Sequence, residues 1–475
     1  MSDLTLPTSD ETWPESAKRA HETFVNIITE QSQQLAKQGQ QLTELTQQLE
    51  QLKRHIKLTS ETSSKPPSSD RGKRLPKKPK SSRSKGAQKG HTGHTRARVE
   101  PDEIVECAEI AEVCDCGGSW RQSEQFSSFQ VTELPPIKPY VTEYRERAVS
   151  CSCCGQERYI TARLPLGESR FGPRVHAMVL ELSLGSRLSM RQIKAHLKQA
   201  FNLQISLGAI SDILKRCAKR TSSAFQKLKR WYQADPEVKH IDETSWYIAG
   251  LRGQLIGSLN DQVVLFQASM KRRVPDIMRL IGEDQTRLII CDRALVYCGW
   301  IYRQLCWAHV LRDFKYLMLY PQHEAQAQEL VKEAQELFKR FKAHRNAELS
   351  TEEYLAQAEL IRCRVYQLLI ELSEREVDQK FDGMVRNLLK HEAQLWTFLK
   401  YPTISIHNNS QESALRPLVI KRLISFGSNT YAGAQRLTQL MSVIETLKRQ
   451  GRDVFDELTR TFQGEPLSLL PAPKA

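Results

Sequence analysis

The amino-acid sequence predicts an α/β core with a helical insertion, preceded by a coiled coil, a disordered basic linker, a small cysteine-rich β segment and a helical region. Three observations lead to this fold class. Apolar residues repeat every seven positions near the N-terminus, a stretch rich in Lys, Arg, Pro and Ser follows, and strand-like and helix-like patterns alternate after residue 233. The predicted boundaries are 1–58, 59–98, 99–165, 166–232, 233–428 with an insertion at about 320–400, and 429–475.

Length and composition are those of a globular chain. The 475 residues suffice for about three folding units of roughly 150 residues each. Hydrophobic residues make up 40%, and no apolar run approaches the roughly 20 residues that a membrane-spanning helix needs. The N-terminus lacks the pattern of a secretory signal. These features argue against membrane and secreted disulfide-rich classes and predict a cytoplasmic protein.

Residues from about 21 to 58 have the apolar spacing of a long helix. The repeating positions, seven residues apart, are Ile28, Leu35, Leu42, Leu49 and Ile56. Leucines every seven residues with a second apolar seam favour a coiled coil, most simply a homodimer and otherwise a higher oligomer. The alternative is one amphipathic helix that packs on its own domain. The separation of this helix from any core by the following linker favours oligomerisation.

The linker carries nearly all of the excess charge. The chain has 69 Lys and Arg against 55 Asp and Glu, a net charge of +14, and residues 53–98 hold fifteen basic residues against two acidic ones. Such a segment buries too little apolar surface to fold alone. We expect it to be disordered when free and to attract the DNA backbone, with a purely solvated linker as the alternative. Its central basic residues are Lys73, Arg74, Lys77 and Lys78.

Two pairs of cysteines lie in the β-prone segment 99–165. Cys114 and Cys116 form one pair, and Cys151 and Cys154 form the other. Four thiolates of this kind are a common ligand set for structural Zn²⁺. Disulfides are disfavoured in the cytoplasm, which strengthens the metal interpretation. Ordinary reduced thiols are the alternative, and Cys153 is a substitute ligand.

Residues 172–232 lack strand patterns and contain two helix starts. Ser189 begins one helix, a turn lies around residues 201–203, and Ser206 begins a second helix. This order is consistent with a helix-turn-helix, whose second helix enters the major groove of DNA. Helical pairs are common, so this pattern alone does not identify the motif.

The core begins with strands. Strand patterns cover 238–242, 246–248, 254–258 and 263–267, a helix is expected at 274–281, and a buried strand at 287–292. Residues 322–400 then show helical spacing, and Ser350 with Glu353 forms a capping-box pattern. The sequence therefore predicts an α/β sheet interrupted by helices.

Three acidic residues in this core are candidates for a shared site. Asp242 and Asp292 end strands that we expect to be neighbours, and Glu412 lies in a later helix. Converging carboxylates repel one another unless they share cations, and Mg²⁺ or Mn²⁺ prefers oxygen ligands. Glu243 and Glu445 are rivals for Asp242 and Glu412, and surface acids unconnected to any site are the simplest alternative.

Several motifs resemble the insertion sequence 66 family of bacterial transposases. They are residues 238–244 (VKHIDET), 306–309 (CWAH), 408–417 (NNSQESALRP), 65–70 (KPPSSD) and 90–94 (GHTGH). The order of segments matches as well. The resemblance implies a core of ribonuclease-H-like type and a transposase of the DDE type, with the triad at Asp242, Asp292 and Glu412. It also implies DNA strand cleavage and strand transfer, binding of terminal inverted repeats and target DNA, companion proteins of the same element, and association with the nucleoid.

Around this triad we expect supporting residues. His309 is placed near the scissile phosphate, Asn409 supports the triad helix, and Arg416 contacts a DNA phosphate or braces Glu412, with a surface salt bridge as the alternative. Cys306 and His309 have the spacing of metal ligands, but the sequence offers no second pair nearby, so a structural role is preferred.

Three substitutions depart from the family pattern. His407 replaces an Asp, Ser413 replaces an Arg, and Arg293 replaces a Gly. These departures keep two other hypotheses open. One is a non-catalytic or inactivated DNA-binding regulator that uses the zipper, basic arm and helix-turn-helix. The other is a nuclease of the same fold that cuts DNA without joining it.

Overall fold

The structure is a computed structural model that describes residues 13–59, 62, 97–105, 114, 116–120, 127–160 and 169–471. The linker cations Lys73, Arg74, Lys77 and Lys78 lie outside these ranges, as do the KPPSSD and GHTGH motifs. Within the described ranges, no helix combines the length and apolarity needed to cross a membrane.

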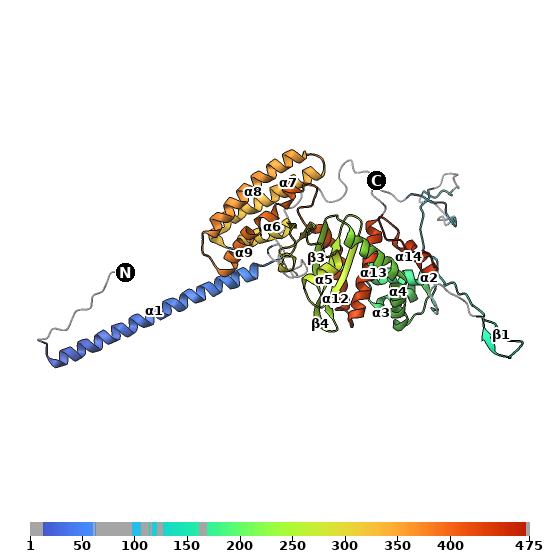
Figure 1. Ribbon diagram of the computed structural model, residues 1–475, viewed down its shortest axis with the longest axis horizontal. Coiled ribbons are helices and arrows are strands. Elements are labelled where there is room, and N and C mark those ends of the chain that lie inside the picture. Colours follow the sequence, from blue (N-terminus) through green and yellow to red (C-terminus); the bar gives the residue numbers. More distant parts are fainter. Residues whose placement is uncertain are drawn as a thin grey trace.

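The N-terminal region is one long helix, α1 (Glu15–Lys57), which begins earlier than the heptad pattern predicted. It extends away from the rest of the chain (Figure 1). Its end contacts the helical insertion, because Arg54 forms an ion pair with Asp378 at 3.0 Å and lies over the ring of Tyr320. The heptad leucines are exposed; Leu35 and Leu42 have exposed fractions of 68% and 69%.

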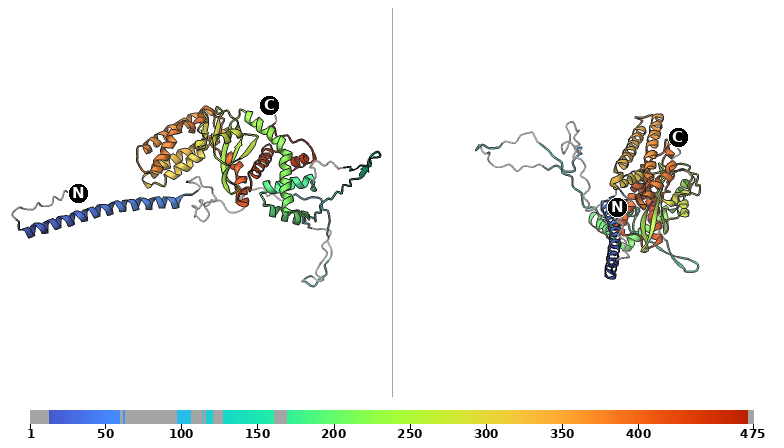
Figure 2. Two further views of the ribbon diagram at one scale, coloured as in Figure 1. Left: turned by 60° about the horizontal axis from the view of Figure 1, so that its bottom comes forward. Right: turned by 90° about the vertical axis from the view of Figure 1, so that its left-hand side faces the viewer.

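The cysteine-rich segment contains a small hairpin. Its strands are β1 (Ala148–Ser150) and β2 (Glu157–Tyr159), which pair in antiparallel fashion. The views in Figure 2 place this segment apart from the core. All residues of both strands are exposed, so the hairpin has little apolar packing of its own.

A group of helices precedes the sheet. They are α2 (Pro173–Leu180), the π-helix η2 (Glu181–Gly185), α3 (Met190–Phe201) and α4 (Leu207–Ala234). The predicted starts are confirmed: Ser189 caps α3 in a capping box with Gln192, and Ser206 caps α4. The second helix is much longer than the first. It continues for 28 residues because buried side chains such as Phe225 and Leu228 extend its apolar face into the core.

The core is a five-stranded sheet in the order β5-β4-β3-β6-β7. The strands are β3 (Lys239–Ile248), β4 (Leu251–Leu259), β5 (Val264–Ser269), β6 (Ile289–Cys291) and β7 (Arg303–Leu305). The first three are antiparallel, and β6 and β7 run parallel to β3. The two segments predicted at 238–242 and 246–248 are one continuous strand, and β7 was not predicted. Between β5 and β6 lies α5 (Val274–Ile281), as predicted.

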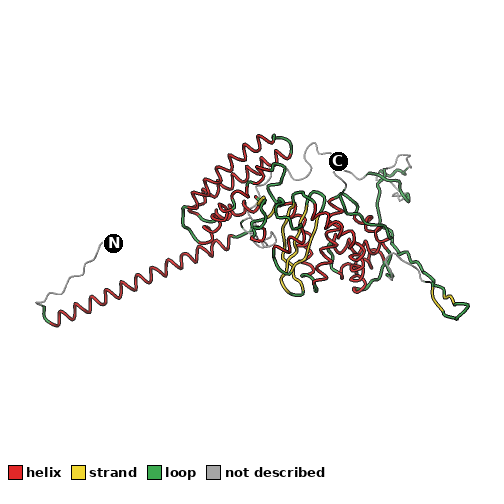
Figure 3. The backbone as a smooth tube through the Cα atoms, in the orientation of Figure 1, coloured by secondary structure: helices red, strands yellow, loops and turns green. Residues whose placement is uncertain are grey.

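The insertion is helical, as expected. It contains α7 (Glu324–Arg345), α8 (Thr351–Ser373), α9 (Gln379–Lys390), α10 (Glu392–Leu395) and α11 (Thr397–Lys400), preceded by α6 (Trp307–Leu317). The tube in Figure 3 separates this group from the strands at the centre. The predicted apolar face of α7 is buried, and Ser350 and Glu353 form the predicted capping box.

Three helices complete the core: α12 (Asn409–Ser425), α13 (Tyr431–Arg449) and α14 (Val454–Gln463). The side chains of α13 cover the edge strand β5. Ser442 and Thr446 accept hydrogen bonds from the backbone N–H groups of Phe266 and Val264 at 2.8 and 3.1 Å. These contacts satisfy donors that an open sheet edge would present to other chains.

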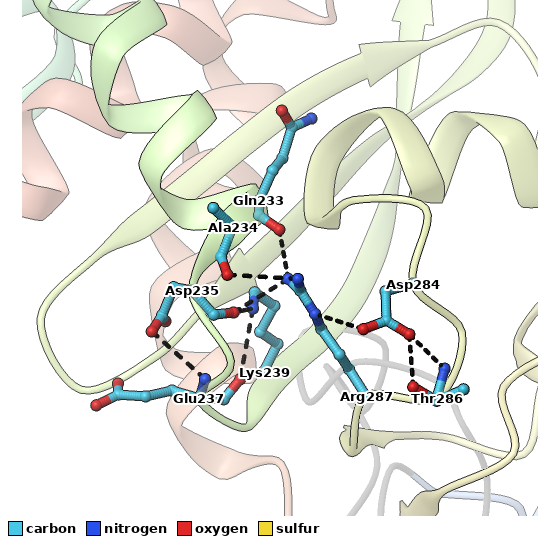
Figure 4. A network of polar contacts seen from close by, with 8 residues as sticks. All are labelled: Gln233, Ala234, Asp235, Glu237, Lys239, Asp284, Thr286 and Arg287. Atoms are coloured by element: carbon cyan, nitrogen blue, oxygen red, sulfur yellow. Dashed lines mark hydrogen bonds and ion pairs between the residues drawn. The ribbon is translucent and has the colours of Figure 1, made fainter.

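A polar network joins α4 to the sheet (Figure 4). The Arg287 guanidinium donates to the carbonyls of Gln233, Ala234 and Asp235 at the end of α4. Buried Lys239, on β3, donates to the Asp235 carbonyl at 2.5 Å. Cations at a helix C-terminus complement its unpaired carbonyls. The helical region is therefore fixed directly to the strand that carries Asp242.

Candidate active site

Asp242 and Asp292 lie on neighbouring parallel strands. The register pairs His240 of β3 with Ile290 of β6, so two residues further along Asp242 faces the position of Asp292. Across the other side of β3, Asp242 is paired with Gly257 of β4. A side chain at position 257 would point at Gln411 of α12. Since directly opposed residues share a face of the sheet, Asp242 points to the face that α12 covers.

Glu412 reaches this place through the start of α12. Asn408, the residue before this helix, is buried, and its side-chain amide donates to the Ile241 carbonyl at 2.8 Å. Its Oδ1 lies 2.9 Å from Nδ1 of His240. The Asn408 carbonyl accepts the backbone N–H of Glu412 at 3.1 Å. One side chain thus connects the first turn of α12 to the backbone beside Asp242.

The electrostatics show that Asp292 and Glu412 lie near enough to Asp242 for their charges to act on its carboxyl. Burial, the largest cause, and the charges of Asp292 and Glu412 together raise the pKa of Asp242 to about 8. Like charges act this way when carboxylates share a site. The rival Glu445 instead forms an ion pair with Lys448 at 3.2 Å on α13. The rival Glu243 accepts a hydrogen bond from the Tyr297 hydroxyl and forms an ion pair with Arg272.

Arginines surround the carboxylates. Arg272, which follows β5, lies 3.7 Å from the Asp292 carboxylate. Arg312 of α6 lies 3.1 Å from Oε1 of Glu412. Arg293, the residue after Asp292, is mostly buried and pairs with Asp313. These cations partly balance the charge of the acids.

Of the three predicted supporting residues, His309 lies near the acids, whereas Asn409 and Arg416 are exposed. His309 lies beside the triad, with Nδ1 3.9 Å from Oε1 of Glu412. Asn409 is exposed, and its buried neighbour Asn408 has the predicted supporting contacts. Arg416 is also exposed, and no ion pair is found for it in the described part of the chain. Arg312 is the residue that braces Glu412.

Cys306 belongs to a group of three potential metal ligands that the sequence alone did not reveal. Its sulfur, His309 and Glu412 offer donor atoms that all lie within 4.8 Å of one another. The spacing of Cys306 and His309 was visible in the sequence, but their third partner lies about a hundred positions away in the chain. Only the approach of α12 to the start of α6 brings it near.

The four predicted zinc ligands form two separate turns. In one, the Cys114 N–H donates to Gly118 and its carbonyl accepts from Gly117. In the other, the Cys151 N–H donates to Gln156 and its carbonyl accepts from Gly155. A hydrogen bond from the Gly118 backbone lowers the pKa of Cys116, and one from the Cys154 backbone lowers that of Cys151. Within the described ranges, these pairs are not brought together into a cluster of three or more ligands.

The three departures from the family pattern are accommodated locally. His407 packs against the rings of Phe338 and Phe341 of the insertion. Ser413 is exposed on α12. Arg293 pairs with Asp313, as described above. Each substitution changes the surroundings of the acids without removing one of them.

Comparison with known families gives two matches. A family model described as Transposase IS66 family matches residues 168–436, which is more than half of the chain. A second model, described as a family of unknown function (DUF6444), matches residues 13–97. No curated protein matches the chain. The first match spans the α2–α4 helices, the sheet, the insertion and α12, and it confirms the resemblance carried by the sequence motifs. The chain belongs to the IS66 family of transposases, and this membership implies a function in DNA transposition.

Proposed function

We propose that this chain is a DDE-type transposase that cleaves and joins DNA at the ends of an insertion sequence, with Asp242, Asp292 and Glu412 as its catalytic acids. The observations that carry this proposal are the register that sets Asp242 beside the position of Asp292 and the action of the Asp292 and Glu412 charges on the Asp242 carboxyl. This action appears in the pKa of Asp242.

The topology of the sheet supports a ribonuclease-H-like core. Its first strand, β3, is central, two antiparallel strands follow on one side, and two parallel strands lie on the other. The first acid lies in the central strand, the second follows its parallel neighbour, and the third comes from a helix on the sheet. The long insertion enters between β7 and α12, so it leaves this arrangement intact.

The donor set fits the divalent cations that the family implies. Asp242, Asp292 and Glu412 offer only carboxylate oxygens, the ligands that Mg²⁺ and Mn²⁺ prefer. Their repulsion, which raises the pKa of Asp242, is relieved by positive charge. When bound there, such ions supply activation of the attacking hydroxyl and neutralisation of the phosphate charge.

The chain itself positions these groups. Asn408 fixes the start of α12 against β3 and thereby places Glu412. Arg312 orients the Glu412 carboxylate, and Arg272 is close enough to Asp292 to exchange that contact for a DNA phosphate. Arg293 has a buried Nη1 without a hydrogen-bond partner in the described structure, which is a second donor for the phosphate. Charge stabilisation by such fixed groups is the main contribution that proteins make to phosphoryl transfer.

DNA ends are recognised outside the core in this proposal. We further propose that binding of a structural Zn²⁺ brings together the separate turns that hold Cys114, Cys116, Cys151 and Cys154, and that this segment, with α3 and the start of α4, contacts the terminal inverted repeats. Exposed Arg191, Lys194 and Lys198 share one face of α3, which suits phosphate contacts. The basic linker adds affinity that does not depend on sequence. These contacts would keep the protein on nucleoid DNA.

Two subunits bring two DNA ends together. The exposed seam of α1, with Leu42 and Leu49 as examples, suits a homodimeric coiled coil because its apolar positions repeat at the required spacing. Companion proteins of the same element are further expected partners.

The experiment is cleavage of end-containing DNA in the presence of Mg²⁺. Asp292→Ala is expected to bind the DNA ends but to lose cleavage, because one carboxylate of the shared set is gone. Glu445→Gln is the matched control, since its acid lies on another helix, and it should cleave like wild type. Cleavage by Asp292→Ala would refute the triad.

The same assay separates the other hypotheses. The hypothesis of a non-catalytic DNA-binding regulator is favoured by the three substitutions that depart from the family pattern near the site. If it is right, the wild-type protein binds DNA ends without cutting them. A nuclease without joining activity would yield cut ends but no products linked to target DNA.

A further inference from the structure

Three residues of different chemistry meet beside the carboxylate triad. Cys306 is the residue before α6, His309 lies in the first turn of that helix, and Glu412 lies in the first turn of α12. Residues three apart lie on the same face of a helix start. The donor atoms of all three lie within 4.8 Å of one another, and this is the one such group in the described part of the chain.

Cys306 is buried in this cluster, and His309 and Glu412 are half-buried. The Cys306 sulfur is almost inaccessible, and it accepts the backbone N–H of Asn408 at 3.2 Å. Burial raises the pKa of the Cys306 thiol to about 11, and the backbone N–H groups of Asn408, His309 and Ala308 oppose this only in part. A metal ion bound here therefore has to displace the thiol proton, because the thiolate is the form that binds metal.

The imidazole of His309 has a free acceptor in this cluster. Its Nδ1 is buried and makes no hydrogen bond to any described residue. A buried polar atom without a partner is uncommon, and a neutral imidazole nitrogen is a preferred ligand of transition metals.

We propose that Cys306, His309 and Glu412 bind a Zn²⁺ ion. Thiolate, imidazole and carboxylate are its usual protein ligands, and three of them leave one position open. Donors around a tetrahedral zinc lie roughly 3.5 Å apart, so the cluster contracts only slightly on binding. A thiolate ligand selects Zn²⁺ over Mg²⁺.

Because Glu412 also belongs to the triad, zinc bound at this site regulates DNA cleavage, a consequence that rests on the proposed function. The same carboxylate belongs to the triad, so a zinc ion bound to Cys306 and His309 withdraws it from the Mg²⁺ site. Arg312, 3.1 Å from Glu412, opposes any cation here by its own charge. Zinc and magnesium therefore compete for one side chain, and zinc is an inhibitor of the reaction.

The test uses Co²⁺ as a spectroscopic substitute for Zn²⁺ in the full-length chain. The six cysteines between residues 107 and 154 are first replaced by serine so that the other cysteine cluster does not contribute. We expect a thiolate-to-cobalt charge-transfer band that saturates at one equivalent and disappears when Zn²⁺ is added. Absence of the band would overturn the proposal.

Ligand variants in the same background identify the site. Cys306→Ser should abolish the band, and His309→Ala should weaken binding by more than the roughly 10–100-fold caused by loss of an outer-shell partner. Cys363→Ser, which removes an exposed cysteine of α8, is the matched control and should change nothing. Circular dichroism verifies folding; if Cys306→Ser is unfolded, His309→Ala decides. A band of unchanged strength in that variant contradicts the assignment.

Two further titrations separate this site from the proposed catalysis. Arg312→Ala should tighten Co²⁺ binding about fivefold, because it removes a nearby like charge. Added Mg²⁺ should weaken Co²⁺ binding if Glu412 is shared. If Co²⁺ binding requires Cys306 but does not change with added Mg²⁺, the zinc site is supported and the shared role of Glu412 is overturned. Failure of the triad is detected independently, by DNA cleavage in Asp292→Ala.

Discussion

At the scale of single residues, Asp242 has the most unfavourable environment among the three acids. Its carboxyl is taken from water by the sheet and by α12, and two further carboxylates lie near it, so its pKa rises to about 8 from an ordinary value of 3.8. The folded protein therefore keeps a proton on Asp242 that the unfolded chain releases. By linkage, this group makes the metal-free protein less stable as pH rises between these two values.

We predict that this pH dependence disappears in Asp242→Asn. At pH 8 without metal, the variant should be more stable than wild type by on the order of 1 kcal/mol, a value reduced for the partial exposure of the side chain. At pH 4 the two proteins should be equally stable, because the carboxyl is largely protonated in the folded protein. Urea unfolding in the presence of a chelator measures both differences. Parallel pH profiles for the two proteins would show that Asp242 is not perturbed.

Asn408 is the residue whose loss should loosen the site without touching an acid. Asn408→Ala removes buried hydrogen bonds to Ile241 and His240, and it should lower the free energy of unfolding by about 1–3 kcal/mol. Asn409→Ala is the matched control; its side chain is exposed, and the change should stay within about 0.5 kcal/mol. Equal effects of the two substitutions on thermal or urea unfolding would contradict the assignment of Asn408.

The sequence offers three acids as candidates, but it does not reveal the residues that contact them. Asp242 and Asp292 follow from strand patterns and Glu412 from a later helix, and the family resemblance implies that the three form a triad. Asn408 and Asn409 are adjacent and chemically identical, so only the orientation of the first turn of α12 decides which one is buried. Arg312 lies a hundred positions from Glu412, and no local pattern links them.

At the scale of elements, the placement of α12 depends on its close approach to β4. Gly257 lies opposite Asp242 in the sheet, and a Cβ at this position would overlap the Gln411 side chain and press on Leu415 at 3.1 Å. The absent side chain lets the helix lie near enough for Glu412 to reach the acids of the strands. The C-terminal part of α12 is fixed as well, because Arg422 donates to Thr244 and Ser245 of β3.

Gly257→Ala should therefore displace α12 and reduce DNA cleavage more than DNA-end binding. The overlap is with a buried amide, so we also expect a loss of stability of about 1–3 kcal/mol. Gly383→Ala in α9 is the control, because nothing lies within 4 Å of its added Cβ. Alanine is preferred over glycine in a helix, so this control should gain about 0.5–1 kcal/mol. A Gly257→Ala protein with wild-type cleavage would mean that α12 does not position Glu412.

The elements were predicted with different success. Helix starts at Ser189, Ser206 and Ser350 were predicted correctly because a capping serine is a local signal. The strand β7 was missed, since it has three residues and contains Arg and Gln. These polar side chains are buried by tertiary contacts, such as the bond from Gln304 to the Leu395 carbonyl at 2.9 Å. The length of α4 likewise depends on packing that comes from distant helices.

At the scale of the whole molecule, the net charge is concentrated outside the core. Replacing Lys73, Arg74, Lys77 and Lys78 by alanine should reduce the slope of log affinity for DNA against log salt by about 3–4, because each phosphate contact releases close to one counterion. The matched control removes four exposed cations of α7, namely Lys332, Lys339, Lys342 and Arg345. DNA binding measured by fluorescence anisotropy over a range of salt concentrations distinguishes the linker variant from the control. An equal loss of slope in both proteins would assign the effect to net charge alone.

The arrangement of segments follows from this separation of charge and core. The heptad pattern, the basic linker and the α/β alternation each extend over many residues, so the sequence predicts an order of regions. The contacts between these regions could not be predicted from the sequence. The contact of α1 with the insertion depends on Arg54 and Asp378, which lie more than three hundred positions apart in the chain.

The most direct test of the central claim is the binding of Mn²⁺ to the DNA-free protein, measured by electron paramagnetic resonance. If Asp242, Asp292 and Glu412 share a cation site, wild type binds Mn²⁺, and Asp242→Asn, Asp292→Asn and Glu412→Gln each lose this binding while Glu445→Gln retains it. Three triad variants that bind Mn²⁺ as wild type does would contradict the account.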